Sequence, residues 1–164
     1  MKELILVRHA KSSWANIGQD DFNRPLNERG HHDAPMMAER LIEKDIKIDQ
    51  FISSNAFRAF TTATYFAKAW GQESTDIVQH QSLYHAPPVK FIEAIVQIKD
   101  NINTAAIFAH NPGITEFVNQ LTDTKIDDMP TCAVFAIKLG ITSWKDFKKG
   151  PKQFWFFKYP KQLP

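Results

Sequence analysis

Short, unbroken apolar runs that stop at polar or charged residues are the feature that most limits how this chain can fold. Leu4 to Val7 is the first such run, and Asp49 to Ser53 and Thr104 to Ala109 have the same character. Runs of this length without alternation are typical of strands buried on both faces, as in a parallel sheet covered by helices. The runs therefore predict three such strands, with polar residues at their carboxyl ends.

Between these runs the apolar residues recur at helical spacing, which predicts amphipathic helices. A weaker helix is predicted over Pro88 to Asn101, and Pro35 conflicts with a single helix from Asn27 to Lys44. We expect a kink at Pro35 or a start near Asp33. The stripes are Ala34, Met37, Ala38, Leu41 and Ile42, then Phe60, Ala63, Ala67 and Trp70, then Ile114, Phe117, Val118 and Leu121, and in the weaker helix Ile92, Ile95 and Val96.

The C-terminal part has a different pattern. Cys132 to Leu139 and Phe154 to Tyr159 are β-like segments joined by a polar loop that contains glycine, which predicts an antiparallel pair at one edge of the sheet. Alternating strands and helices predict a three-layer α/β/α sandwich with a mostly parallel central sheet. A chain of 164 residues fits a single domain, residues 1–164.

Charge and cysteine content narrow the function classes. The net charge of +2, from 20 basic and 18 acidic residues, favours neither a nucleic-acid nor a membrane partner. The loop lysines Lys145, Lys148, Lys149 and Lys152 are expected to be solvated, and no apolar stretch approaches the length of a membrane span. With Cys132 as the single cysteine, expected to be buried and inert, no intrachain disulfide can form, and the expected location is cytoplasmic.

Three polar clusters follow the predicted strands. Arg8-His9 follows the first, the segment from Ser53 to Arg58 follows the second, and His110 opens the segment after the third. Ligands of such sheets bind outside the carboxyl ends of the strands. Two arginines and two histidines buried together there are costly unless an anion or an acidic residue neutralises them.

A phosphoryl group is the anion that suits this set. Arginine presents a planar fork that matches phosphate oxygens. A histidine is a competent covalent nucleophile through one ring nitrogen if an acceptor holds the other, and a second histidine can donate to the developing charge. No cluster has metal-ligand spacing, so neither metal nor cofactor is expected.

Four segments resemble a known family. Arg8-His9-Ala10 resembles the Arg-His-Gly signature of the histidine phosphatase superfamily, which includes the cofactor-dependent phosphoglycerate mutases. The SixA-type phosphohistidine phosphatases are a closer likeness, through Arg8 to Trp14, Arg24 to Gly30, Ser53 to Thr62 and His110 to Gly113. The resemblance implies that His9 is the phosphorylated nucleophile, and that Arg8, Arg58 and His110 form the phosphate pocket. It also implies hydrolysis of phosphohistidine on a protein, in signal transduction.

The chain departs from the mutase branch in the loop from Leu83 to Pro88. Related enzymes carry there a carboxylic acid that protonates the leaving oxygen, whereas this loop has no carboxylate until Glu93. General acid catalysis contributes about 10²–10⁴-fold, which a poor alkoxide leaving group needs and an imidazole leaving group does not. The loop therefore favours phosphohistidine over phosphoesters, with Asp21, His85 and Glu93 left as alternative proton sources.

Other polar residues have structural interpretations. Arg24 is expected in a salt bridge, and Asp20 and Asp21 in a surface loop or at a helix entry rather than at a metal. His31 and His32 are expected on a helix surface.

Alternative functions remain open from the sequence. The same chemistry on a small phosphoester or nucleotide is the nearest, and a non-catalytic phosphate-binding module is disfavoured because all four core residues are present. A mutase is disfavoured by the short chain. The expected partner is a phosphorylated histidine-phosphotransfer or carrier protein, or a small phosphorylated metabolite, and the expected state is a monomer.

Overall fold

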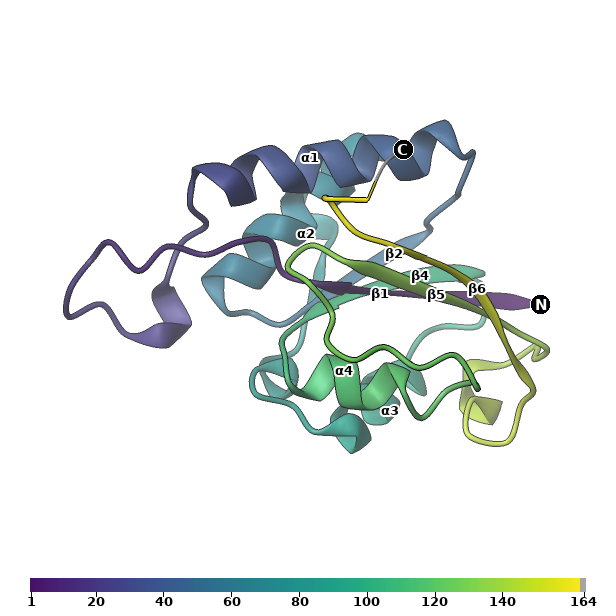
Figure 1. Cartoon of the computed structure of the whole chain (residues 1–164). Helices are drawn as coiled ribbons and strands as arrows, with labels where there is room; N and C mark the ends of the chain where they lie inside the picture. The colour runs from purple at the N-terminus through teal and green to yellow at the C-terminus, as the bar shows by residue number, and fades with distance from the viewer. Residues whose placement is uncertain (163–164) are drawn as a thin grey trace.

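The computed structural model describes residues 1–162, and six strands in it form one sheet (Figure 1). The strand order across the sheet is β3-β2-β4-β1-β5-β6. Neighbours among β1 to β4 are parallel, whereas β5 runs antiparallel to both β1 and β6. The predicted parallel sheet with an antiparallel C-terminal edge is confirmed. The strands are β1 (Lys2–Arg8), β2 (Gln50–Ser53), β3 (Val78–Gln79), β4 (Thr104–Ala109), β5 (Val134–Leu139) and β6 (Lys152–Lys158).

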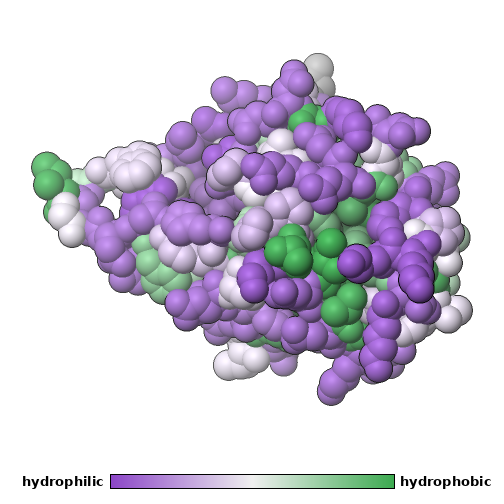
Figure 2. Space-filling view, turned by 90° about the horizontal axis from the view of Figure 1, so that it is seen from below, coloured by the Kyte–Doolittle hydropathy of each residue, from purple (hydrophilic) through white to green (hydrophobic). Residues whose placement is uncertain are grey.

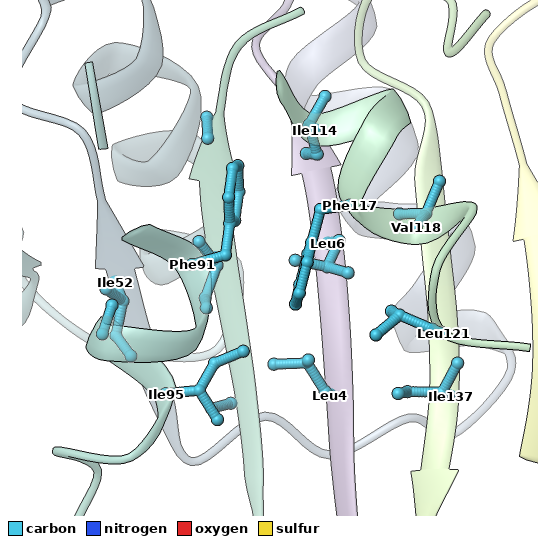
Figure 3. Packing of buried hydrophobic residues seen from close by; sticks show 14 of the residues in the cluster. Leu4, Leu6, Ile52, Phe91, Ile95, Ile114, Phe117, Val118, Leu121 and Ile137 are labelled. Carbon is cyan, nitrogen blue, oxygen red and sulfur yellow. The ribbon is translucent and has the colours of Figure 1, made fainter. Parts of the chain in front are cut away.

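Helices cover both faces of the sheet, which confirms the three-layer sandwich. α1 (Glu28–Glu43) and α2 (Phe57–Ala69) lie on one face, and α3 (Pro88–Ile95) and α4 (Gly113–Val118) on the other (Figure 1). Side chains of β1 alternate between the two resulting cores. Leu4 and Leu6 pack toward α3 and α4, as Figure 3 shows, and the residues between and after them face α1 and α2.

Helix α1 differs from its predicted start. It begins at Glu28, where the Asn27 side chain accepts the Gly30 N–H at 2.9 Å, and it continues through Pro35. A start near Asp33 is therefore wrong. Proline removes one intrahelical hydrogen bond, but the buried stripe Ala34, Met37, Ala38 and Leu41 anchors this helix on the sheet.

Other boundaries also differ from the prediction, and the sequence does not predict β3. α3 ends at Ile95 and not at Asn101. β5 begins at Val134, because Cys132 has a φ of 61° and its N–H turns back to the carbonyls of Arg8 and His9. β3 is only two residues long, and no period can be recognised over so short a segment.

The surface is mostly polar. On the face that carries α3 and α4, Figure 2 shows one small apolar patch among polar residues, and apolar atoms at the end of a projecting segment. The connection between β1 and α1 projects from the body in Figure 1, and Ile17 within it is fully exposed. No helix among residues 1–162 is both long and apolar enough to cross a bilayer.

Candidate active site

His9 directly follows β1 and is buried, with 6% of its surface exposed. Its Nδ1 lies 2.7 Å from the Ala10 carbonyl oxygen, which can only accept, so Nδ1 carries the hydrogen and Nε2 keeps its lone pair. Arg58 Nε donates to that lone pair at 3.3 Å. Burial, together with the positive charges of Arg58 and Arg8, lowers the pKa of His9 to about 3. At neutral pH the ring is therefore an uncharged base held in one tautomer.

The backbone around His9 is fixed by helix α2. Ala10 N–H donates to Thr62 Oγ1 at 3.0 Å, and Thr62 in turn donates to the Arg58 carbonyl at 2.8 Å. Thr62 lies one helical turn after Arg58, so one residue couples the helix that carries Arg58 to the loop that orients His9.

Arg58 is buried, and Asp21 holds its guanidinium in place. Nη1 donates to the Asp21 carbonyl at 2.6 Å, and Nη2 donates to the Asp21 carboxylate at 2.9 Å. The guanidinium has five N–H groups, of which these contacts and the His9 contact use three. Two remain for an anion.

The Asp21 carboxylate accepts hydrogen bonds from several side chains at the site. It accepts from Arg24 Nε at 3.1 Å and from the Tyr84 hydroxyl at 2.5 Å, in addition to Arg58. Burial alone would raise the pKa of Asp21, but the hydrogen bonds from Tyr84 and Arg58 and the charge of Arg58 hold it well below its usual range. Asp21 does begin a short 3₁₀ helix, as predicted for a helix entry, but its side chain is not a mere surface-loop group.

His110 follows β4 and lies beside His9, with their ring centroids 5.1 Å apart. Its Nε2 is 2.8 Å from Ser54 Oγ, which also accepts the Ala56 N–H. Its Nδ1 is buried and has no hydrogen-bond partner. Burial and the nearby His9 and Arg58 lower the pKa of His110 to about 2. The ring is thus neutral, with one nitrogen unsatisfied.

Arg8 lies at the edge of this group. Its Nη1 donates to the Met129 carbonyl at 2.7 Å, and its Nε is buried without a partner. Burial lowers the pKa of Arg8, while the charge of Asp128 opposes that shift. The structure therefore brings His9, Arg58 and His110 into one cluster, and it turns Arg8 toward the loop before β5.

The other predicted polar groups lie around this cluster or on the surface. Arg24 is in a salt bridge as predicted, and it also donates to Ser12 Oγ at 2.9 Å. Glu93 pairs with Lys90 on the surface of α3. His85 is exposed, with its Nε2 3.7 Å from the Asp21 carboxylate and its ring 6.5 Å from that of His110.

The structural residues behave as expected. His31 and His32 are exposed on α1, and Cys132 is buried, which raises the pKa of its thiol. Residues 1–162 contain no group of three or more His, Cys, Asp or Glu side chains placed to hold a metal ion.

The sequence did not predict that Tyr84 contacts the site, or that the Asp21 carboxylate holds Arg58 in place. Tyr84 donates to Asp21, and its ring stands edge-on to His110 at 5.5 Å. The available signal was its place beside His85, in the loop where related enzymes carry their acid.

Comparisons with known proteins identify a family and several relatives of this chain. The profile of the histidine phosphatase superfamily (branch 1) matches residues 4–84. An uncharacterized protein of Mycobacterium leprae is 32% identical over 119 residues, 71% of each chain. The mitochondrial serine/threonine-protein phosphatase Pgam5 of Drosophila melanogaster is 31% identical over 88 residues, which are 54% of this chain and 30% of that protein.

Solved structures share the fold over nearly the whole chain. A candidate phosphohistidine phosphatase SixA from Agrobacterium tumefaciens has a TM-score of 0.79 at 22% identity, covering 97% of this chain and 98% of the other. The protein histidine phosphatase SixA with tungstate has a TM-score of 0.78 at 16% identity, covering 96% and 97%. A mycobacterial glucosyl-3-phosphoglycerate phosphatase with VO3 has a TM-score of 0.71 at 14% identity, covering 94% and 97%.

The matched segment runs from β1 through Tyr84 and so contains His9, Asp21 and Arg58. The fold around it is that of the SixA structures. This chain belongs to the histidine phosphatase superfamily (branch 1) and is a hydrolase of the histidine phosphatase type.

Proposed function

We propose that the protein removes the phosphoryl group from phosphohistidine on another protein, through a covalent phosphohistidine at His9. The observation that carries the proposal is the neutral His9 ring, with Nδ1–H held by the Ala10 carbonyl and the Nε2 lone pair facing Arg58. A nucleophile of this kind needs no further deprotonation before it attacks phosphorus.

Two displacements complete the reaction. His9 Nε2 attacks phosphorus, and the P–N bond to the substrate imidazole breaks, with a proton from solvent on the departing nitrogen. A water oxygen then attacks the phosphorus on His9, loses its proton to solvent, and releases inorganic phosphate and the neutral ring. Neither step requires a metal, since the cationic side chains supply the charge.

The surrounding donors are placed to stabilise the transferring group. Arg58 keeps two free N–H groups beside His9. Ser54 Oγ, which already accepts from Ala56, can give its own proton to His110 Nε2, and in that tautomer His110 Nδ1–H is a buried donor awaiting an acceptor. Arg8 adds a second cationic group beside Arg58. Preorganised donors of this kind act on charge that develops in the transition state.

The protein phosphohistidine substrate follows from the leaving group. Asp21 is held in its ionised form by hydrogen bonds from Tyr84, Arg58 and Arg24, so it is not a proton donor at neutral pH. Glu93 is paired on the outer surface of α3. An imidazole can depart without a dedicated carboxylic acid, whereas an alkoxide cannot.

A small phosphoester is the second candidate substrate. The observation that favours it is His85, whose ring lies next to the Asp21 carboxylate and near His110, where it could protonate a leaving oxygen. The glucosyl-3-phosphoglycerate phosphatase with the same fold acts on such a substrate by its name.

A labelling experiment tests the proposal. A histidine-phosphotransfer domain carrying ³²P-phosphohistidine should lose its label to inorganic phosphate, with transient acid-labile label on the enzyme. His9→Asn should abolish both turnover and enzyme labelling. Turnover by His9→Asn would exclude the covalent role, and faster turnover of sugar phosphates would favour the second candidate. EDTA should leave the rate unchanged.

A cytoplasmic, monomeric signalling enzyme made of one catalytic domain is part of this proposal. The single, buried cysteine and the near-neutral net charge support that setting. Sedimentation at micromolar concentration should report a mass close to 18.8 kDa.

A further inference from the structure

A basic cavity of about 370 Å³ lies next to the cluster around His9. Four segments form it, namely the loop after β1, the first turn of α1, the loop before β5 and the segment after β6. Its charged lining residues are Arg8, Lys11, Arg29 and Lys161, and the rest of the lining is Pro130, Thr131, Tyr159 and Pro160. Four cations and no carboxylate therefore line one small cavity.

The nearby acids do not neutralise this lining. Asp33 is buried and pairs with Arg29 at 3.3 Å, and the charge of Asp128 acts on Arg8. Two acids thus face four cations, and neither acid lines the cavity. A concave site with an excess of one charge attracts ligands of the opposite charge.

Hydrogen bonds and close packing hold the cavity walls together. Lys11 is fixed against α1, because its carbonyl accepts the Asn27 N–H at 3.0 Å and lies where a side chain on Gly30 would be. The segment after β6 is tied to the same helix by Arg40, which donates to the carbonyls of Tyr159 and Pro160. The cavity is therefore preformed.

Arg8 connects this cavity to the chemistry. It lines the cavity, it immediately precedes His9, and its charge acts on His9. Its Nε is buried without a partner. Because the charge of Arg8 acts on His9, an anion bound to Arg8 in the cavity would lie within electrostatic range of the phosphoryl group on His9.

We propose that this cavity binds a second anionic group of the substrate, a carboxylate or a phosphate, while the phosphoryl group is bound at His9. The subsite rests on the phosphatase function proposed above and deepens it. For a phosphohistidine protein, the group is an acidic side chain near the modified histidine. For a small molecule, it is a second phosphate.

Matched phosphohistidine peptides test the subsite. One peptide carries glutamates beside the phosphohistidine and the other carries glutamines. The double variant Lys11→Gln/Lys161→Gln removes two lining charges without changing Arg8. The matched control is Lys148→Gln/Lys149→Gln, which removes the same charge from two exposed lysines outside the cavity.

Wild type should prefer the glutamate peptide by about tenfold in kcat/KM, chiefly through KM, as two partly exposed ion pairs allow. The preference should fall toward unity in Lys11→Gln/Lys161→Gln, persist in the control, and weaken with added salt. Hydrolysis of p-nitrophenyl phosphate, which has no second anion, should be the same in all three proteins.

A second arm distinguishes the source of the anion. Propane-1,3-diol bisphosphate and propyl phosphate are compared as inhibitors of p-nitrophenyl phosphate hydrolysis. If Lys11→Gln/Lys161→Gln weakens inhibition by the bisphosphate but not by propyl phosphate, the result supports the subsite with a small molecule as the source of the second anion.

Equal peptide preference and equal inhibition in the double variant and the control would overturn the subsite. Failure of the phosphatase proposal would look different, because p-nitrophenyl phosphate hydrolysis dependent on His9 would then be missing from wild type.

Discussion

At the scale of single residues, the site combines side chains that the sheet edge brings together with side chains that orient them, namely Asp21 and Tyr84. His9, Arg58 and His110 follow strands of one parallel sheet, and the carboxyl ends of such strands share an edge, so their proximity could be derived. Asp21 and Tyr84 come from irregular connections, whose path no hydrophobic period determines. Their contacts with Arg58 and with each other were therefore beyond prediction.

Asp21→Asn tests whether Asp21 positions Arg58 or acts as an acid. The amide keeps an acceptor but loses the charge that holds the guanidinium, so we expect kcat/KM to fall about 10- to 100-fold, as for loss of a buried charged hydrogen bond. A positioning role predicts an equal loss for aryl phosphates of low and high leaving-group pKa. A loss that grows with leaving-group pKa would instead identify Asp21 as the proton donor.

Arg58→Ala should cost about 2–4 kcal/mol of transition-state stabilisation, by analogy with loss of one preorganised donor. Arg58→Lys should recover only part of this, because an ammonium cannot bond His9, Asp21 and an anion in one plane. Single-turnover rates of His9 phosphorylation measure the effect. Full activity of the lysine variant would mean that Arg58 acts as a simple charge.

At the scale of elements, the spacing of apolar residues and the polar residues that end each run predicted most of the strands and helices. The differences from the structure have local causes. α1 runs through Pro35 because the burial of Ala34, Met37, Ala38 and Leu41 on the sheet outweighs the one hydrogen bond that the proline removes. α3 ends at Ile95 although Ile98 is still buried, because the N–H groups of Gln97 and Ile98 bond the carbonyls three residues before them and the helix gives way to turns. β5 starts late because of the left-handed backbone at Cys132.

Gly30 couples α1 to the loop after His9. A Cβ at Gly30 would fall well inside contact with the Lys11 carbonyl oxygen, which is backbone and cannot swing away. Helix propensity alone would make Gly30→Ala stabilising by about 1 kcal/mol. We expect overpacking to reverse that sign, with a net loss of about 1–3 kcal/mol of unfolding free energy and reduced activity.

Urea unfolding measures this change, and Glu39→Ala, at an exposed position on the same helix, is the control that should stay within about 0.5 kcal/mol of wild type. A more stable Gly30→Ala protein would show that α1 can shift away from the loop at little cost.

At the scale of the whole molecule, the site imposes an acid sensitivity on folding. His9 and His110 are both buried and neutral, with pKa values lowered to about 3 and about 2 by burial and by neighbouring positive charge. In the unfolded chain the same rings titrate near pH 6.5. As the pH falls below that value, the unfolded state binds two protons that the folded state does not, so the folded state loses stability.

The expected slope is about 1.4 kcal/mol per pH unit for each ring, or about 3 kcal/mol per unit for both, between roughly pH 6 and pH 4. Urea unfolding at pH 7, 6 and 5 measures it. His110→Gln removes one of the two groups and should reduce the slope by about half, whereas His32→Gln, at an exposed position on α1, should keep the wild-type slope. Identical slopes for wild type and His110→Gln would mean that His110 takes up its proton as readily in the folded as in the unfolded state, which would contradict its assignment as a ring kept neutral by burial.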